Sequence, residues 1–161
     1  MPNITAILDN VSKAIENLPN RVAATAVIFS KKRFVEQNWH DTEEKPWQKR
    51  SRQRRGGKAR QRGAVLVDSG TLKRSIRVIS ADKQRVIIGT DVPYAQIHNE
   101  GLDAPLPVKA HTRRSRKGRS HTVRAHSRNV KMPKRQFIGE SQALATEIEN
   151  MIHAEIEKAL Q

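Results

Sequence analysis

The sequence predicts an α+β fold in which helices near both ends of the chain flank a small antiparallel β-sheet. Apolar residues recur at intervals of three and four in residues 4–34 and 141–160, which is the period of an amphipathic helix. Residues 64–101 contain short β-rich runs separated by turn residues. Because helices and strands occupy separate stretches, an antiparallel sheet is favoured. The 161 residues are typical of one domain, which we take to span 1–161.

Two helices are expected before residue 40. The first carries the apolar stripe Ile4, Ile7, Leu8, Val11, Ile15 and Leu18. It is expected to end near Leu18, because Pro19 disfavours helical backbone in the residue before it. A second helix is expected from about Arg21 until the apolar period is lost at Trp39-His40.

Residues 42–63 are expected to form a basic loop. They are charged or polar, include Gly56-Gly57, and contain Trp47 as their one large apolar anchor. Because they have no apolar period, we expect them to order only on contact.

A turn and a short helical segment are expected after this loop. Gly70 permits a tight turn, and Thr71 is expected to cap a helical turn through Leu72. The runs 75–80 and 85–89 then predict a β-hairpin that ends at Gly89.

The alternation in the first strand of this hairpin predicts one packed face and one wet face. Ile76 and Val78 are expected on the packed face and Arg77 on the wet face.

A second short helix is expected after the hairpin. Asp91 is expected to cap it, Pro93 lies in its first turn, and Gly101 follows its end. Tyr94 and His98 lie one turn apart on one face. We expect both rings to pack this helix against the sheet, with each polar tip taking one hydrogen bond.

Residues 106–132 form a second basic segment with two interpretations. Its Thr, Val, Ser and Arg residues fit a two-stranded ribbon that turns near Lys117-Gly118, and they equally fit a disordered arm. Pro133 then interrupts the chain, and Ser141 to Leu160 are expected to form the final helix, with Leu144, Ile148, Ile152, Ile156 and Leu160 at intervals of four.

The positive charge is concentrated in these two segments. Residues 45–62 and 109–135 hold 20 of the 31 Lys and Arg residues and none of the 16 Asp and Glu residues. The formal net charge of +15 therefore comes from two cationic arms on an otherwise acidic body. The residues considered for contact with a partner or with DNA are Arg50, Arg52, Arg54, Arg55, Arg60, Arg62, Arg113, Arg114, Arg116, Lys117, Arg119, Arg124 and Arg128.

A series of short motifs in fixed order resembles the phage Mu G-type virion morphogenesis family. The residues that carry the resemblance are Trp47, the run 66–76 with Gly70, Leu72 and Ile76, the run 86–90 with Gly89, Tyr94-Ala95, His98, Gly101, and the run Pro133-Lys134-Arg135-Gln136-Phe137-Ile138-Gly139. The long basic insertion between Gly101 and Pro133 departs from the family pattern.

The resemblance implies a structural role in a tailed phage and no catalysis. It implies tail completion or head-to-tail joining, within a homo-oligomeric ring, for which we expect a hexamer, between the portal or connector side and the tail tube or sheath side. The expected location is the virion neck, after synthesis in the host cytoplasm. Arg135 is expected either to pair with an acidic residue of a neighbouring subunit or to be solvated.

Other functional classes find little support in the residues. Cys is absent, and His111, His121 and His126 are loosely spaced among cationic residues, so we expect neither a metal site nor a cofactor. No nucleotide-binding or hydrolase motif is present, and no run approaches the length of a membrane span.

Two kinds of partner are compatible with the basic arms: DNA and acidic protein surfaces. Arginine suits phosphate groups, so either arm fits non-specific contact with DNA passing through a neck. Acidic protein surfaces are the partner that we favour, because the second arm lacks the aromatic residues that stack on single strands. A basic nucleic-acid-binding protein outside the virion is the alternative function, and a phage nuclease or packaging accessory is a third class.

Overall fold

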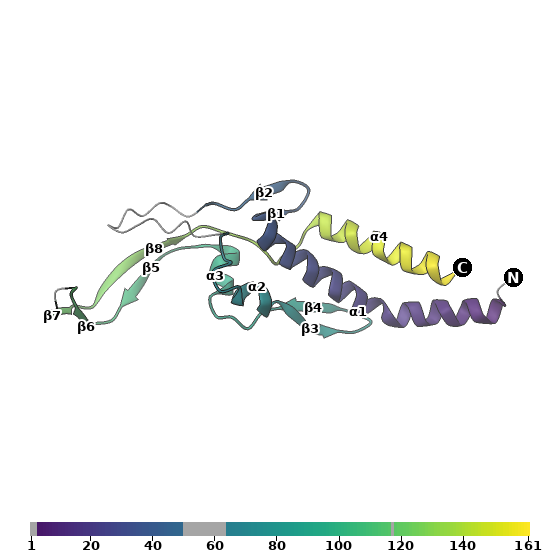
Figure 1. Ribbon diagram of the computed structural model, residues 1–161, viewed down its shortest axis with the longest axis horizontal. Coiled ribbons are helices and arrows are strands. Elements are labelled where there is room, and N and C mark those ends of the chain that lie inside the picture. The colour runs from purple at the N-terminus through teal and green to yellow at the C-terminus, as the bar shows by residue number, and fades with distance from the viewer. Residues whose placement is uncertain (1–2, 50–63, 117) are drawn as a thin grey trace.

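The computed structural model describes residues 3–49, 64–116 and 118–161. Within these residues the chain forms four helices and eight short strands, and the strands pair into four two-stranded antiparallel sheets. The predicted α+β class is confirmed. Figure 1 shows an elongated molecule, in which helices α1 and α4 and both termini lie at one end and a long β-ribbon projects from the other.

Helix α1 runs without interruption over Ile4–Glu36 and contains Pro19. The expected break after Leu18 is therefore wrong. A proline in a helix removes one hydrogen bond and disfavours helix before it, but packing on both sides of that position can offset this loss. Here α4 lies along α1, and Leu18 and Pro19 border a groove shared with the 82–86 turn of a hairpin.

The chain leaves α1 through Gln37, whose φ of 59° is left-handed, and enters a small hairpin. Its strands are β1, Asn38–His40, and β2, Glu44–Pro46. Strand β2 lies inside residues 42–63, which were expected to be a loop. The expectation missed it because a strand of three residues can pair with β1 without an apolar period of its own. The rest of the expected loop, residues 50–63, lies outside the described residues.

Helix α2, Thr71–Ser75, follows a turn at Gly70, whose φ of +72° is left-handed. The expected cap at Thr71 is wrong. Thr71 is already the first helical residue, and its backbone N–H donates a hydrogen bond to the hydroxyl oxygen of Ser69 at 3.3 Å.

Strands β3, Arg77–Ala81, and β4, Val86–Gly89, confirm the expected hairpin. The expected packed face is only partly formed: Ile76 is buried before β3 begins, whereas Val78 and Ile79 are exposed. A shift in pairing between Val78 and Ser80 interrupts the alternation, and such a bulge turns side chains away from the face that a regular strand gives them.

Helix α3, Ala95–Glu100, begins after Tyr94 rather than at a side-chain cap on Asp91. The Asp91 carboxylate instead accepts a hydrogen bond from Arg77 at 3.1 Å. A backbone hydrogen bond, with Arg77 adding to it, lowers the pKa of the exposed Asp91. The expected Asp91 cap is wrong because the N-cap position is Tyr94, three residues after Asp91.

The segment after α3 is a β-ribbon, which confirms the first of the two interpretations. Strand β5, Leu102–Val108, pairs with β8, His126–Met132, and strand β6, His111–Arg114, pairs with β7, Ser120–Val123. The ribbon starts four residues before the expected boundary at 106. Lys117, at its turn, lies outside the described residues.

Helix α4, Gln142–Ala159, confirms the expected final helix. The Ser141 hydroxyl accepts a hydrogen bond from the Leu144 N–H at 3.1 Å, as an N-cap does. The helix runs back along α1, and Arg21 forms an ion pair with Glu155.

The core joins elements that are distant in the sequence. Phe34 of α1 lies between two aromatic rings, with ring centroids 5.4 Å from Trp47 and 5.0 Å from Phe137. The buried residues of this core are Phe34, Trp47, Val65, Leu72, Ile76, Ala95 and Phe137. Tightly packed aromatic groups of this kind fix the relative positions of the segments that carry them.

Candidate functional site

Residues 133–138 form a joint between the helical body and the ribbon. They follow β8 directly and are hydrogen-bonded to α3, so they form one of the two chain connections between ribbon and body. The Arg135 N–H donates to the His98 carbonyl at 2.8 Å. Phe137, two residues later, inserts into the aromatic core, which anchors the joint in the body.

Asn99 holds this joint through three hydrogen bonds. Its side-chain oxygen accepts from the N–H groups of Phe137 at 2.9 Å and Ile138 at 3.0 Å. Its side-chain nitrogen donates to the Ile138 carbonyl at 3.0 Å. One side chain thus satisfies three backbone groups in a segment without regular secondary structure.

The joint also binds the segment that leads out of the β1–β2 hairpin. The Trp47 indole N–H donates to the Gln136 carbonyl at 2.9 Å. The Arg135 guanidinium donates twice to the Gln48 carbonyl, at 3.1 Å and 3.0 Å. Arg135 is only 6% exposed, so the expected solvated state is wrong. Its charge is held inside the joint, where it ties residues 47–48 to the base of the ribbon.

Gly101 allows the ribbon to begin close to the joint. Its φ of +83° and ψ of 172° lie in a region that only glycine adopts readily. A Cβ atom at this position would lie 3.0 Å from both the Lys134 nitrogen and the Met132 oxygen. A side chain here would therefore force the backbone of the joint away from α3.

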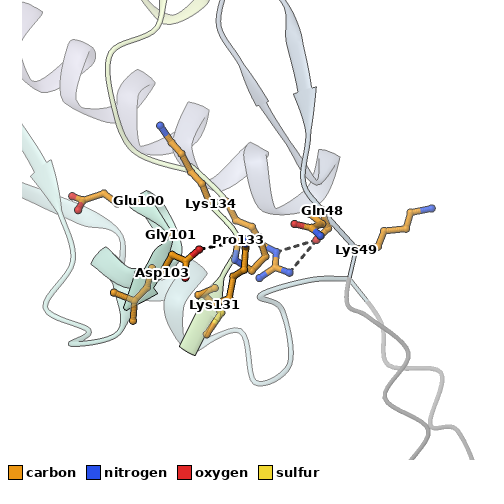
Figure 2. A pocket seen from close by; sticks show the side chains of 11 residues that line it. Gln48, Lys49, Glu100, Gly101, Asp103, Lys131, Pro133 and Lys134 are labelled. Atoms are coloured by element: carbon orange, nitrogen blue, oxygen red, sulfur yellow. Dashed lines mark hydrogen bonds and ion pairs between the residues drawn. The ribbon is translucent and has the colours of Figure 1, made fainter. Parts of the chain in front are cut away.

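A cavity of about 900 Å³ lies at this base (Figure 2). Its lining carries charges of both signs, from Glu100 and Asp103 and from Lys49, Lys131, Lys134 and Arg135. Lys131 forms an ion pair with Asp103 at 3.3 Å. This mixture of charges favours neither an anion nor a cation as ligand.

The Tyr94 and His98 rings contact each other edge to face, with centroids 5.9 Å apart. The expectation that each polar tip takes one hydrogen bond is wrong for His98, because its Nδ1 atom is buried and has no partner among the described residues. Burial, with the nearby charge of Arg135 adding to it, lowers the pKa of His98. His98 is consequently held in its neutral form at neutral pH.

The remaining motif residues lie in the body. Leu72 and Ile76 are buried beside Trp47, Gly70 precedes α2, and Gly89 ends β4 against the side chain of Ile79. Pro133 lines the cavity at the ribbon base. Together these positions build the body and the joint, and none of them reaches the ribbon tip.

The described basic candidates gather on the ribbon, far from the joint. All of them are exposed: Arg113, Arg114, Arg116, Arg119, Arg124 and Arg128. The other arginine candidates, Arg50, Arg52, Arg54, Arg55, Arg60 and Arg62, and Lys117 lie outside the described residues. The structure therefore presents one cationic surface at the far end of the molecule.

The three histidines of this segment do not gather in the structure. His111 and His126 each contact a carbonyl two residues earlier in the chain, Lys109 and Arg124, at 3.0 Å and 2.9 Å. Across the part of the chain that the structure describes, no three His, Asp or Glu residues are grouped as metal ligands would be.

Two structural residues were not identified from the sequence. Besides Asn99, Arg33 is buried in α1, where its guanidinium donates to Asn38 at 3.0 Å and lies 2.8 Å from Glu36. It also lies over the Phe29 ring, with 4.5 Å between the guanidinium carbon and the ring centroid. For Arg33 the one available signal was its place in a helix beside apolar residues.

Comparisons with known proteins identify one family. A sequence model of the phage virion morphogenesis family matches residues 3–157. Searches among curated proteins and among solved structures gave no significant match. None of the described helices combines the length and apolarity that crossing a membrane requires.

Proposed function

The chain belongs to the phage virion morphogenesis family, and from this premise we propose that it completes the tail and joins head to tail as a structural protein of the phage neck. The family supports a role in virion assembly. The resemblance of the motif series to the phage Mu G type supports the narrower role at the end of the tail.

The observation that best supports this role is a densely hydrogen-bonded joint that carries a long basic ribbon. Hydrogen bonds from buried Arg135, buried Trp47 and half-buried Asn99 fix the base of the ribbon to the body. Little of the ribbon packs on the body, so it extends a binding surface away from it (Figure 1). A junction protein needs this arrangement, because it must hold its own layer together and reach another.

We propose a ring of identical subunits, with a hexamer as the expected form. The two ends of the elongated molecule differ, since one carries the helices and the other the basic ribbon. Contact between unlike surfaces of identical subunits produces a ring when the rotation closes. The proposed neighbours of this ring are the portal or connector on one side and the tail tube or sheath on the other.

The proposed role is non-catalytic. The Arg135 guanidinium and the Asn99 side chain are hydrogen-bonded to backbone groups of the joint and of the segment that it holds. The motif residues thus serve folding, and the ribbon serves contact.

The position of the protein in the particle tests this function. We expect gold particles that recognise a C-terminal tag on the chain to label purified virions at the junction of head and tail. Label over the capsid shell or along the tail shaft would contradict the proposed position, and unlabelled virions beside free tagged protein would favour the alternative role outside the virion.

Contact with duplex DNA is a second proposed property of the ribbon. Exposed arginines on a narrow two-stranded ribbon suit backbone phosphates, and such binding weakens steeply with salt. We expect the purified chain to retain duplex DNA of any sequence at low salt. Absence of retention near physiological salt would restrict the ribbon to protein partners.

A further inference from the structure

We propose that the ribbon of one subunit docks on the helical end of a second copy of this chain, along the N-terminal half of α1 and the acidic face of α4. This inference rests on the proposed ring and names the surfaces by which neighbouring subunits meet.

The stem of the ribbon has one apolar face. Paired residues of an antiparallel ladder lie on the same face, and successive residues alternate between faces. The register of β5 and β8 places eight residues on one face, of which six are apolar: Leu102, Ala104, Leu106, Val108, Val130 and Met132. The other two, His126 and Arg128, lie toward the tip of the ribbon. The opposite face holds Asp103, Pro105, Asn129, Lys131 and Ser127. On the apolar face Leu106 is 41% exposed and the other five apolar residues are half-buried. Among the described elements, neither strand packs extensively against any element but the other, so part of this face is left open to a partner.

The N-terminal half of α1 has an apolar stripe that is also uncovered. Ile4, Leu8 and Ile15 lie on one helical face and are 75%, 65% and 51% exposed. Apolar side chains in regular helical spacing at such exposure are typical of an interaction surface.

The two apolar surfaces match in length. From Leu102 to Val108 the strand rises about 20 Å at 3.3 Å per residue. From Ile4 to Ile15 the helix rises about 17 Å at 1.5 Å per residue. The ribbon stem can therefore cover the whole stripe.

The charges that flank the two surfaces are opposite in sign. Residues 109–131 contain nine basic and no acidic residues. Residues 140–161 contain five glutamates and one lysine. In α4, Glu149 and Glu157 are exposed and lie two turns apart, on one face. This complementarity favours a second copy over another occupant, because both surfaces belong to this chain.

The positions of the surfaces exclude docking within one subunit and define its direction between two. The ribbon and the helical end lie at opposite ends of the molecule (Figure 1). Placing a second copy end to end brings the ribbon base to Ile4 and directs the basic tip along the neighbour toward α4. Such a contact joins unlike surfaces and propagates around a closed ring.

Cross-linking between differently substituted chains tests this contact directly. The chain has no cysteine, so introduced thiols react alone. We would mix a Leu106→Cys chain with a tagged Leu8→Cys chain and add a short bismaleimide. Ser127→Cys is the matched control, because Ser127 lies on the opposite face of the same ribbon. We expect the Leu106→Cys chain to form a cross-linked dimer with the Leu8→Cys chain. Its yield should be several times the yield that the Ser127→Cys chain gives with the same partner.

Charge reversal provides an independent measurement. We expect Arg113→Glu to weaken self-association about tenfold, measured as the dissociation constant by sedimentation. Arg74→Glu, with the same charge change on exposed α2, should leave it unchanged. A partner with Glu149→Lys and Glu157→Lys should restore binding to the Arg113→Glu chain, and circular dichroism should show that every variant is folded.

Three results would overturn the inference. A chain that remains monomeric at all concentrations would remove the second copy as occupant. Oligomers with equal cross-linking from Leu106→Cys and Ser127→Cys would leave the ring but place its contacts elsewhere. Loss of DNA retention in Arg113→Glu with unchanged self-association would assign the ribbon to DNA. Gold label at the neck remains a separate result, so failure of the contact and failure of the proposed function can be distinguished.

Discussion

Asn99 is the residue on which the joint depends most, because one side chain satisfies three backbone groups of residues 137–138. Asn99→Ala leaves those partly buried groups without partners, and each such loss costs about 1 kcal/mol or more. We expect the free energy of unfolding to fall by about 2–4 kcal/mol, measured by urea denaturation. Asn17→Ala, which removes one exposed bond to Lys13, is the matched control and should change it by less than about 0.5 kcal/mol. Equal effects would contradict the role of Asn99.

His98 should make the stability of the protein depend on pH. Burial and Arg135 lower its pKa in the folded chain below the ordinary 6.5, so the unfolded chain binds the proton more tightly. The free energy of unfolding should therefore fall as the pH drops through about 6.5 and level off below the folded pKa. His98→Gln should flatten this part of the curve, measured by denaturant midpoints between about pH 8 and 5. An unchanged slope in the variant would assign the pH dependence to other groups.

At the scale of elements, the connection between α3 and β5 requires a glycine. Gly101→Ala meets both an unfavourable backbone conformation and the backbone atoms of residues 132 and 134. We expect it to lower the free energy of unfolding by about 1–3 kcal/mol. Gly118→Ala is the matched control, since its φ is also positive, at +81°, but nothing lies within 4 Å of the added Cβ. A larger effect at Gly118 than at Gly101 would contradict the close approach of the ribbon to the joint.

Replacing the internal proline of helix α1 should stabilise the protein. Pro19→Ala restores a backbone donor within the helix and removes the clash of the ring with the preceding turn. We expect a gain of about 1–3 kcal/mol in the free energy of unfolding, offset in part by lost contact with the 82–86 turn. A loss of stability would show that this contact outweighs the helical hydrogen bond.

The sequence predicts well the elements whose structure depends on local residues alone. Helix α4 has a regular apolar period and a Ser141 cap, and the β3–β4 hairpin has two β-rich runs around a short turn. Helix α1 was expected to break because the effect of Pro19 is local, whereas the packing that offsets it comes from α4 and the hairpin. The ribbon was ambiguous because its tip, residues 109–125, is rich in basic residues and lacks the apolar alternation that packing on a core requires.

The joint was only partly predictable, for a related reason. The motif series drew attention to Trp47, Arg135 and Phe137, which the structure brings together. The role of Asn99 depends on backbone groups of residues 137–138, which are far away in the sequence. A local sequence pattern contains no information about such distant partners. The burial of Arg33 was missed because the same pattern does not show which helical residues the fold covers.

At the scale of the whole molecule, the tip of the ribbon should be dispensable for folding and necessary for assembly. Replacing residues 109–125 by Asn-Gly would close a hairpin between the paired residues Val108 and His126. Because the tip contributes little to the core, we expect the melting temperature to change by no more than a few degrees, measured by circular dichroism. We also expect this variant to be absent from purified particles. Its incorporation at the level of the intact chain would contradict a docking role for the tip.

Electron microscopy of phage lysates tests the central claim most directly. The gene would be disrupted alone, and the intact chain or the variant without the ribbon tip would be supplied from a plasmid. We expect filled heads to accumulate apart from tails, or tails with abnormal ends, and the intact chain alone to restore joined virions. Normal joined virions in the absence of the chain would contradict a role in tail completion and head-to-tail joining.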